Sequence, residues 1–347
     1  MPVWYATREQ VKAALDAAET ARNDAQVDRA IESGSRTIEG LLKRRFYPFT
    51  GTRYFPWPNW RNRSWFRLWL DADELISVAT LVAGGVTIPG SSYFLEPANS
   101  GPPFTSIEIN LGTSATFASG STWQRAIAVT GVFGHSADEA PAGALNGAVS
   151  STTATTLNVT DSSLIGTGTI IRVDSERMIV GGRSMLATGQ TASVLTASSS
   201  DVAITGISAG TIKVGETILV DSERMLVVDV AGTTLTVKRA WDGSVLASHS
   251  GGAAISALRT LTVERGALGT TAATHLDTTA VVKHVVPALV RDLAIAEAIN
   301  QLQQETSGYA RIIGEGENAR EGTGRSLFDL RRDTIATYGR QVRARAV

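Results

Sequence analysis

The chain of 347 residues contains no cysteine, which excludes disulfide bonds, thiolate metal sites and a cysteine nucleophile. Charged residues make up only 19% of it and the formal net charge is -1, so no global field would steer the protein to nucleic acid or to a membrane. No apolar run approaches the roughly 18 residues that a membrane-spanning helix requires. The first residues lack the basic-then-apolar pattern of a signal peptide, and we therefore expect the chain to fold in the cytoplasm.

Apolar residues make up 43% of the chain, which is enough to build several cores, and the length predicts two or three packed regions. The charges are unevenly distributed. No acidic residue lies between Glu39 and Asp71, a stretch that contains the cations Lys43, Arg44, Arg45, Arg53, Arg61, Arg63 and Arg67. The segment from Arg320 to the end holds seven arginines against three acidic residues. Segregated charge of this kind is typical of a protein that docks end to end with partners.

Two internal repeats stand in the middle of the chain. Residues 173–178 and 220–225 both read VDSERM, and the stretches 234–249 and 260–275 both begin with TLTV and end in a histidine. Such repeats usually mark modules that pack on each other. Apolar β-prone residues flank each Asp-Ser-Glu, which predicts a hairpin with a tight polar turn in each copy. Because His249 and His275 hold the same place in the copied unit, a structural hydrogen bond is favoured over metal binding.

Helical patterns occupy the two ends. Capping-box signals and apolar periodicity predict a helix from Thr7 to about Ala18 and a second from Asn23 to about Arg45, packed as an antiparallel pair. Gly34 and Ser35 would let another helix approach closely. Pro287 begins a later helix. After a Gly-rich arm, a last helix capped by Ser326 carries the basic end of the chain.

The region between these ends is expected to be β. Short apolar segments separated by Gly, Pro, Asn and Ser run from residue 52 to residue 134 and again through the repeats. The predicted fold is therefore α+β: a helical bundle from both termini, a β-sandwich-like region and an inserted all-β repeat domain. The predicted divisions are a helical pair (1–50), a β region (51–135), the inserted repeated β domain (136–284), a core helix (285–306) and a flexible arm with the C-terminal helix (307–347).

An aromatic and basic cluster precedes the first strands of the β region. Aromatic residues interleaved with arginine could stack on nucleic-acid bases. We favour the interpretation that they fill an intersubunit seam or cap the sandwich, because protein interfaces collect the same residue types. The residues assigned to this seam are Trp57, Trp60, Trp65, Arg44 and Arg45.

A search for catalytic chemistry finds only weak patterns. Residues 206–210, GISAG, match a nucleophile elbow, but the residues that follow predict a strand where that motif needs a helix. The acid pairs Asp174 with Glu176 and Asp221 with Glu223 could serve a glycosidase or a calcium ion. No denser acid cluster is nearby, so a hairpin turn is favoured for both pairs. We therefore predict no enzyme activity, no cofactor and no metal site.

Several sequence patterns together resemble a known family. Residues 38–46 (IEGLLKRRF), 68–71 (LWLD), 75–78 (LISV) and 131–134 (GVFG), with the Pro287-led helix and the basic tail helix, are similar to the head-to-tail adaptor proteins of long-tailed bacteriophages, also called head-tail connector or head-completion proteins. The resemblance covers residues of about 1–135 and 285–347. The repeated insert departs from the smaller adaptors.

The resemblance implies a structural virion protein of the phage neck, assembled in the host cytoplasm. It implies a homo-oligomeric ring, usually of twelve copies, between the portal protein and the stopper or tail-terminator proteins, with double-stranded DNA passing through the lumen. It also implies that the C-terminal arm and helix dock into the portal. The apolar anchors there would be Leu327, Phe328 and Leu330, and the charge partners Arg331, Arg332 and Arg340.

Two other functions remain open at this stage. The repeats, the acid pairs and the many tryptophans also suit a carbohydrate-binding or carbohydrate-cleaving virion module. A single-strand nucleic-acid binder that uses Arg63, Trp60 and Trp65 is the third interpretation, and its binding would weaken steeply with salt.

Overall fold

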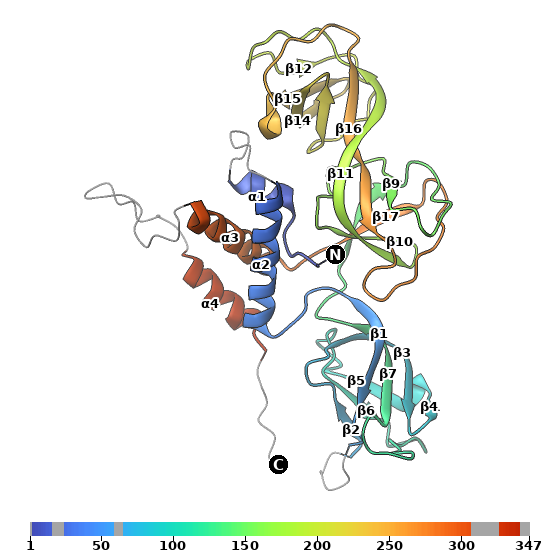
Figure 1. The fold of residues 1–347 in the computed structure, drawn as a ribbon. Helices are drawn as coiled ribbons and strands as arrows, with labels where there is room; N and C mark the ends of the chain where they lie inside the picture. The colour runs from blue at the N-terminus through green and yellow to red at the C-terminus, as the bar shows by residue number, and fades with distance from the viewer. Residues whose placement is uncertain (1, 16–23, 59–64, 307–325, 341–347) are drawn as a thin grey trace, which may run out of the picture.

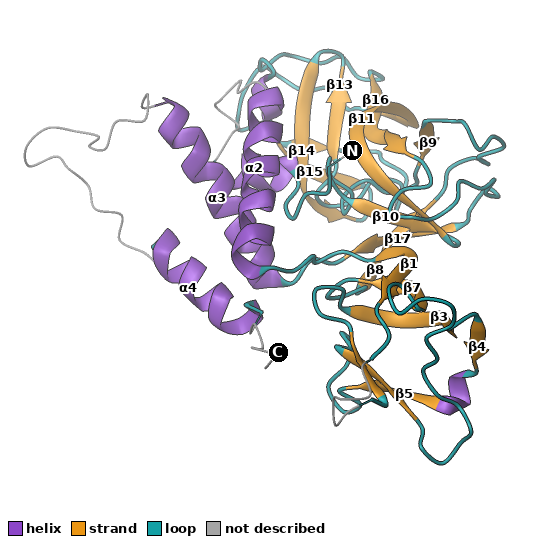
Figure 2. Cartoon of the chain, turned by 60° about the horizontal axis from the view of Figure 1, so that its bottom comes forward, coloured by secondary structure: helices purple, strands orange, loops and turns teal. Residues whose placement is uncertain are grey.

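The computed structural model describes residues 2–15, 24–58, 65–306 and 326–340, and it is mostly β, with 36% of the chain in strands and 20% in helices. The described part holds four α-helices and large antiparallel sheets (Figure 1). The predicted α+β fold with a helical bundle from both termini is therefore wrong. Helical periodicity is confined to the ends of the chain, while the long Thr-, Val- and Ile-rich middle forms sheets. The helices make one layer beside these sheets (Figure 2).

The four helices are α1 (Arg8–Ala14), α2 (Asp24–Leu42), α3 (Ala288–Thr306) and α4 (Leu327–Tyr338). The predicted helix starts are confirmed where a cap defines them. Thr7 and Gln10 form the predicted capping box, and the Ser326 hydroxyl accepts from the amide of Asp329. The Gly-rich arm and the expected end of the first helix near residue 18 lie outside the described residues.

The long helix α2 packs along α3, which comes from the other end of the chain, while α1 is only two turns long. Gly34 makes this approach possible, because a Cβ there would lie 3.1 Å from the Cβ of Glu297. The predicted close approach at this glycine is confirmed. Ser35 serves differently, since its hydroxyl accepts from the amide of Tyr5.

Two small antiparallel sheets form a β-sandwich around one apolar core. The first sheet has the order β1 (Phe49–Phe55), β7 (Ile127–Phe133), β3 (Leu75–Ala83) and β4 (Val86–Ile88), and the second has the order β2 (Arg67–Trp69), β6 (Ser106–Ile109) and β5 (Tyr93–Glu96). Strand β1 ends just before Pro56, which has no amide to continue the ladder.

The copied region forms one ten-stranded antiparallel sheet. Its strands are β8 (Glu139–Ala144), β9 (Thr156–Asn158), β10 (Ile170–Val173), β11 (Glu176–Thr191), β12 (Ala203–Ile204), β13 (Thr217–Val220), β14 (Glu223–Ala231), β15 (Thr234–Lys238), β16 (Ala254–Glu264) and β17 (Ala280–His284). They are ordered β12-β15-β14-β13-β16-β11-β10-β17-β8, and β9 pairs with β16. The predicted hairpins are confirmed, because Val173 pairs with Glu176 and Val220 with Glu223 across two-residue turns.

The sheet contains two modules, one nested inside the other. Module 1 comprises residues 139–180 and 259–284, module 2 comprises residues 192–257, and each has its own apolar core. Val180 pairs with Val263 in module 1 as Val227 pairs with Val237 in module 2. In module 2 a short turn joins these two strands, whereas in module 1 the whole of module 2 takes the place of that turn. The long strands β11 and β16 therefore run through both modules (Figure 1).

Candidate functional site

A buried carboxylate organises module 1. Glu176 is fully buried, and its two oxygens accept from Nε and Nη2 of Arg265 over 2.7 and 2.8 Å. The amides of Gly266 and Ala273 donate to it over 2.8 and 3.0 Å. His275 Nε2 lies 2.8 Å from Glu176 Oε2. Every contact comes from the loop after β16, so the network fixes that loop on the β10–β11 hairpin.

Module 2 repeats the network. Glu223 is also fully buried and accepts from Arg239 over 2.7 and 2.8 Å. The amides of Ala240 and Ala247 and the Nε2 of His249 complete it, at 2.8, 3.0 and 2.9 Å. Each partner occupies the place of its counterpart in module 1. The residues that recur in the two copies are therefore the residues that build this network.

Each histidine lies between two carboxylates. Nδ1 of His275 is 2.8 Å from Asp174, and Nδ1 of His249 is 2.7 Å from Asp221. Carboxylate oxygens only accept hydrogen bonds, so a ring nitrogen that carries a proton donates it to the carboxylate that it faces. The predicted structural role of these histidines is confirmed, since each ring joins a hairpin turn to a loop.

The hydrogen bonds also set the ionisation of the buried acids. Burial by itself would raise the pKa of Glu176, but the bonds from Arg265, Ala273 and His275 lower it to about 2. The pKa of Glu223 is lowered to about 2 in the same way. A carboxylate that is ionised, enclosed and fully bonded cannot reach a glycosidic bond or donate a proton to it. The hairpin-turn interpretation of the acid pairs is confirmed.

A third buried carboxylate connects the two modules. Glu216 of module 2 accepts from Arg259 over 2.8 and 2.6 Å and from both the amide and the hydroxyl of Ser162 in module 1 at 3.1 Å. Burial would raise the pKa of Glu216, whereas the bond from Arg259 lowers it. This pair has no counterpart in module 1, where Thr169 stands at the matching position. The pair of Glu216 and Arg259 therefore connects the two modules and is not part of the repeated unit.

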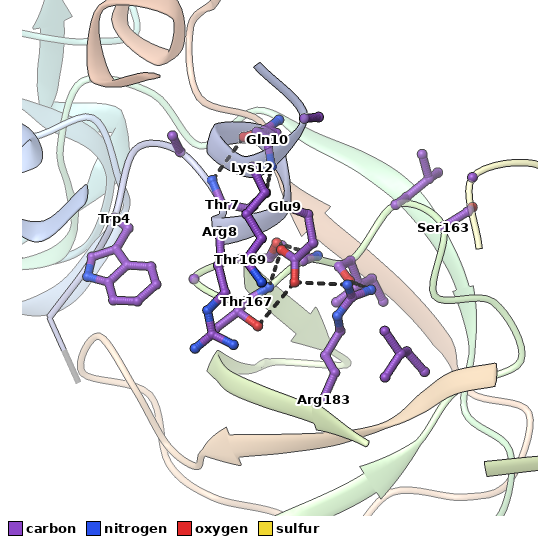
Figure 3. Close-up of a pocket in the computed structure, with 18 of the residues that line it drawn as sticks. Trp4, Thr7, Arg8, Glu9, Gln10, Lys12, Ser163, Thr167, Thr169 and Arg183 are labelled. Atoms are coloured by element: carbon purple, nitrogen blue, oxygen red, sulfur yellow. Dashed lines mark hydrogen bonds and ion pairs between the residues drawn. The ribbon is translucent and has the colours of Figure 1, made fainter. Parts of the chain in front are cut away.

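A cleft of about 540 Å³ lies between α1 and the two modules (Figure 3). Glu9 of α1 accepts from the amide of Thr167 in module 1 and from Arg183, further along β11, both at 2.8 Å. Lys12, one turn further, reaches module 2 through Asp242 at 2.8 Å. The short helix α1 therefore holds both modules at once.

Most charges in this first cleft neutralise one another. Arg8 pairs with Asp28 at 2.6 Å and Arg224 with Asp242 at 2.5 Å. Burial lowers the pKa of Lys12, but its bonds to Asp24 and Asp242 outweigh that and raise it. Such compensated pairs are typical of an internal contact.

A second cleft, of about 630 Å³, lies between the C-terminal end of α2 and the β-sandwich. Its charged lining consists of the cations Arg36, Lys43, Arg44, Arg45 and Arg53 and the acids Glu39, Asp73 and Glu74. Three pairs form across it, Arg36 with Glu39 at 2.8 Å, Arg44 with Glu74 at 3.0 Å and Arg53 with Asp73 at 3.1 Å. The cations outnumber the acids, so this cleft is basic.

The docking residues predicted on α4 divide into two groups. Leu327 and Leu330 pack against the helical core, and Arg331 binds the buried Glu297 at 2.5 and 2.7 Å, so these three hold α4 in place. Phe328 is 71% exposed and Arg332 also faces outward. The sixth predicted residue, Arg340, follows α4, and its amide donates to the carbonyl of Leu42.

One residue of the outward face of α4 was missed by sequence reasoning. Ile335 is 43% exposed and lies seven residues after Phe328, which places both on the same side two turns apart. The seven-residue spacing of Phe328 and Ile335 is visible in the sequence, but periodicity alone does not show which face of the helix packs inward.

The predicted intersubunit residues are not brought together. Arg44 and the exposed Arg45 precede strand β1, whereas Trp57 and the exposed Trp65 follow it, and a seven-residue strand spans about 23 Å. Arg44 is also used internally, by Glu74 and the carbonyl of Tyr338. Trp60 lies outside the described residues.

A further tryptophan, which sequence reasoning did not select, lies near Trp57 on the sandwich. Trp123 is 71% exposed, and its carbonyl accepts from the amide of Trp57 at 2.9 Å. The indole of Trp57 donates to the carbonyl of Phe117 at 2.7 Å. The loop that carries Trp123 is rich in Gly, Ser and Thr and gave no strand signal, so only the strand pairing reveals the contact.

Among the residues that the structure describes, no helix has the length and apolar character to cross a membrane. In that same part of the chain, no group of three or more His, Cys, Asp or Glu side chains is placed to hold a metal ion. No protein-family model, curated protein or solved structure matches this chain.

Proposed function

We propose that this chain is a structural virion protein that forms the neck adaptor ring between the portal vertex of a phage capsid and the stopper or tail-terminator proteins, with DNA passing through the lumen. The outward face of α4 carries the proposal. Phe328 and Ile335 lie exposed on one side of that helix while its other side is fixed to the chain's own core. An exposed aromatic on a fixed helix is the usual anchor of a helix-in-groove contact.

The way α4 is held supports this role. The ion pair between Arg331 and Glu297 and the full burial of Thr334 position the helix before any partner arrives. Preorganisation lowers the entropic cost of docking, and in a ring each docked copy raises the effective concentration of the next. The sheets beside the helices would supply the wall of the ring.

The test replaces the two anchors without touching the contacts that hold α4. Deleting residues 325–347 is unsuitable, because it would leave the buried Glu297 without its partner. The double variant Phe328→Ser with Ile335→Ser should fold as the parent does and lose at least about tenfold in affinity for the portal protein encoded with it, since hot-spot truncations cost about 2 kcal/mol or more. Val245→Ser, at an exposed site in module 2, is the matched control.

Binding and stoichiometry are measured by sedimentation and by mass measurement of the complex. The parent chain is expected to form a ring with portal, and the control variant should do the same. Equal portal binding by the double variant would reject the role of α4. A virion that lacks the chain at its neck would reject the whole proposal.

A carbohydrate-binding decoration module is the second candidate. Its supporting observation is the pair of exposed aromatics Tyr54 and Trp123 on the sandwich, since sugars stack on such rings. Carbohydrate cleavage has lost its support, because Glu176 and Glu223 are enclosed. A glycan-binding screen with the full chain decides this candidate, and absence of binding removes it.

A further inference from the structure

The second cleft carries positive charge that the described chain does not neutralise. Its three acids are each paired with one cation. Lys43 and Arg45 have no carboxylate partner among the described residues, so the lining has a surplus of two positive charges. Both Lys43 and Arg45 are exposed.

The helix dipole accounts for only part of this surplus. A cation after the last turn of a helix relieves the negative end of its dipole, and Lys43 directly follows α2. Arg45 lies beyond that turn. The helix dipole therefore does not account for the charge of Arg45.

The walls of the cleft show what sort of anion would fit. The guanidinium of Arg53 lies 5.0 Å from the ring centre of Phe49 and 5.6 Å from that of Phe133, so aromatic and cationic surfaces alternate. Protein interfaces are enriched in this combination. A cleft of about 630 Å³ accepts a few side chains. The phosphates of a DNA duplex lie on a stiff cylinder that is too wide to enter it.

We propose that the second cleft binds an acidic peptide segment of a partner protein. Carboxylates of that segment would contact the exposed Lys43 and Arg45, and an apolar residue of the segment would pack on the half-buried Phe49. The proposal goes beyond the adaptor role and does not depend on it, because the outward face of α4 takes no part in it.

The test uses the full-length chain and a fluorescent peptide of four glutamates flanked by phenylalanines, with the tetralysine peptide for comparison. Fluorescence anisotropy at moderate salt should show binding of the acidic peptide alone. Arg45→Glu, alone and combined with Lys43→Glu, should weaken it at least tenfold. Lys213→Glu makes the same charge change at an exposed site of module 2 and should have no effect.

Thermal unfolding of each variant shows whether the fold is kept, and Arg45→Gln gives a milder second measurement if a reversed charge disturbs it. No binding by the parent chain would overturn the proposal, as would equal binding by the parent and the Arg45 variants. A duplex DNA oligonucleotide is the third probe. If it binds more tightly than the peptide and loses affinity with the same variants, the site is a nucleic-acid contact and the proposal is wrong.

Discussion

The two modules share one buried network but dock on the rest of the chain through different surfaces. Ile170 and Ile179 of module 1 lie in the core shared with the helices. The matching residues of module 2, Thr217 and Leu226, lie outside that core and line the first cleft, which Ile170 also reaches. The network therefore defines the module itself, while a few residues on one face decide where the module attaches.

The turn after the network shows the same division. Leu268 in module 1 and Asp242 in module 2 have nearly the same left-handed backbone, with φ of 54° and 51°. Leu268 packs on the helical core and its carbonyl accepts from the amide of Thr50 at 2.9 Å, whereas Asp242 pairs with Lys12 and Arg224. One turn thus docks by apolar contact and the other by charge. Charge contacts respond to salt and pH, so we expect module 2 to be the more easily released.

Acid should protonate the buried carboxylate that organises each module and so destabilise both networks. This is the largest effect that we expect. The folded pKa of Glu176 and of Glu223 is about 2, below the ordinary value of 4.5. Lowered values stabilise the fold above the unfolded pKa, and that stability disappears as the pH falls from about 4.5 toward 2. Each network then loses about 3 kcal/mol, about 6 together.

Urea unfolding between pH 5 and pH 2 measures this loss. The variant Glu176→Gln, which cannot titrate at that site, should show a shallower dependence of the free energy of unfolding on pH than the parent. An unchanged slope would mean that the network of module 1 does not stabilise the fold through its charge.

Breaking one network at a time sharpens the comparison. Glu176→Ala and Glu223→Ala each leave a buried arginine and histidine without their carboxylate, which should cost about 3–5 kcal/mol. Hydrogen exchange should then differ between them. Loss at Glu223 should expose amides of module 2 only, while loss at Glu176 should also expose the helical layer, because Ile170 and Ile179 join it to module 1. Ser175→Ala and Ser222→Ala, in the exposed turns, are the controls.

Equal exchange patterns for the two variants would contradict this picture. They would show that the modules unfold together, and that the separate cores of module 1 and module 2 do not act as separate units.

Local sequence signals predicted the elements of these modules well. The two-residue turns, the cap of Thr7 on α1 and that of Ser326 on α4 depend on residues that are close in sequence. The close approach of another helix at Gly34 could be predicted, since a small residue leaves room for one. The sequence did not show that this helix is α3.

The partners of the buried acids could not be predicted. Glu176 meets Arg265 and His275 only because β11 pairs with β16 across the whole of module 2. The sequence did contain a hint, because the two kinds of repeat occur together. The VDSERM repeat supplies the acids, and the repeat that begins with TLTV supplies the Arg and the His. The fold class was wrong for a related reason. Strong helical periodicity at the ends drew the prediction toward a bundle, whereas strands, at 36% of the chain against 20% for helices, dominate the regular structure and pair non-locally.

The smallest effect is expected from a substitution that replaces the ionic turn of module 2 with the apolar turn of module 1. Asp242→Leu places in module 2 the residue that module 1 has at the matching position, and the backbone should accept it because Leu268 holds the same left-handed conformation. The change removes the bonds to Lys12 and Arg224, which are partly exposed, so we expect a loss of about 1 kcal/mol or less. At 1 M salt, where screening acts over about 3 Å, the difference from the parent should nearly vanish. Urea unfolding at both salt concentrations measures this, with Lys213→Ala as the control; an equal loss at high salt would show that Asp242 serves the turn through its shape and that module 2 is not held to α1 by charge.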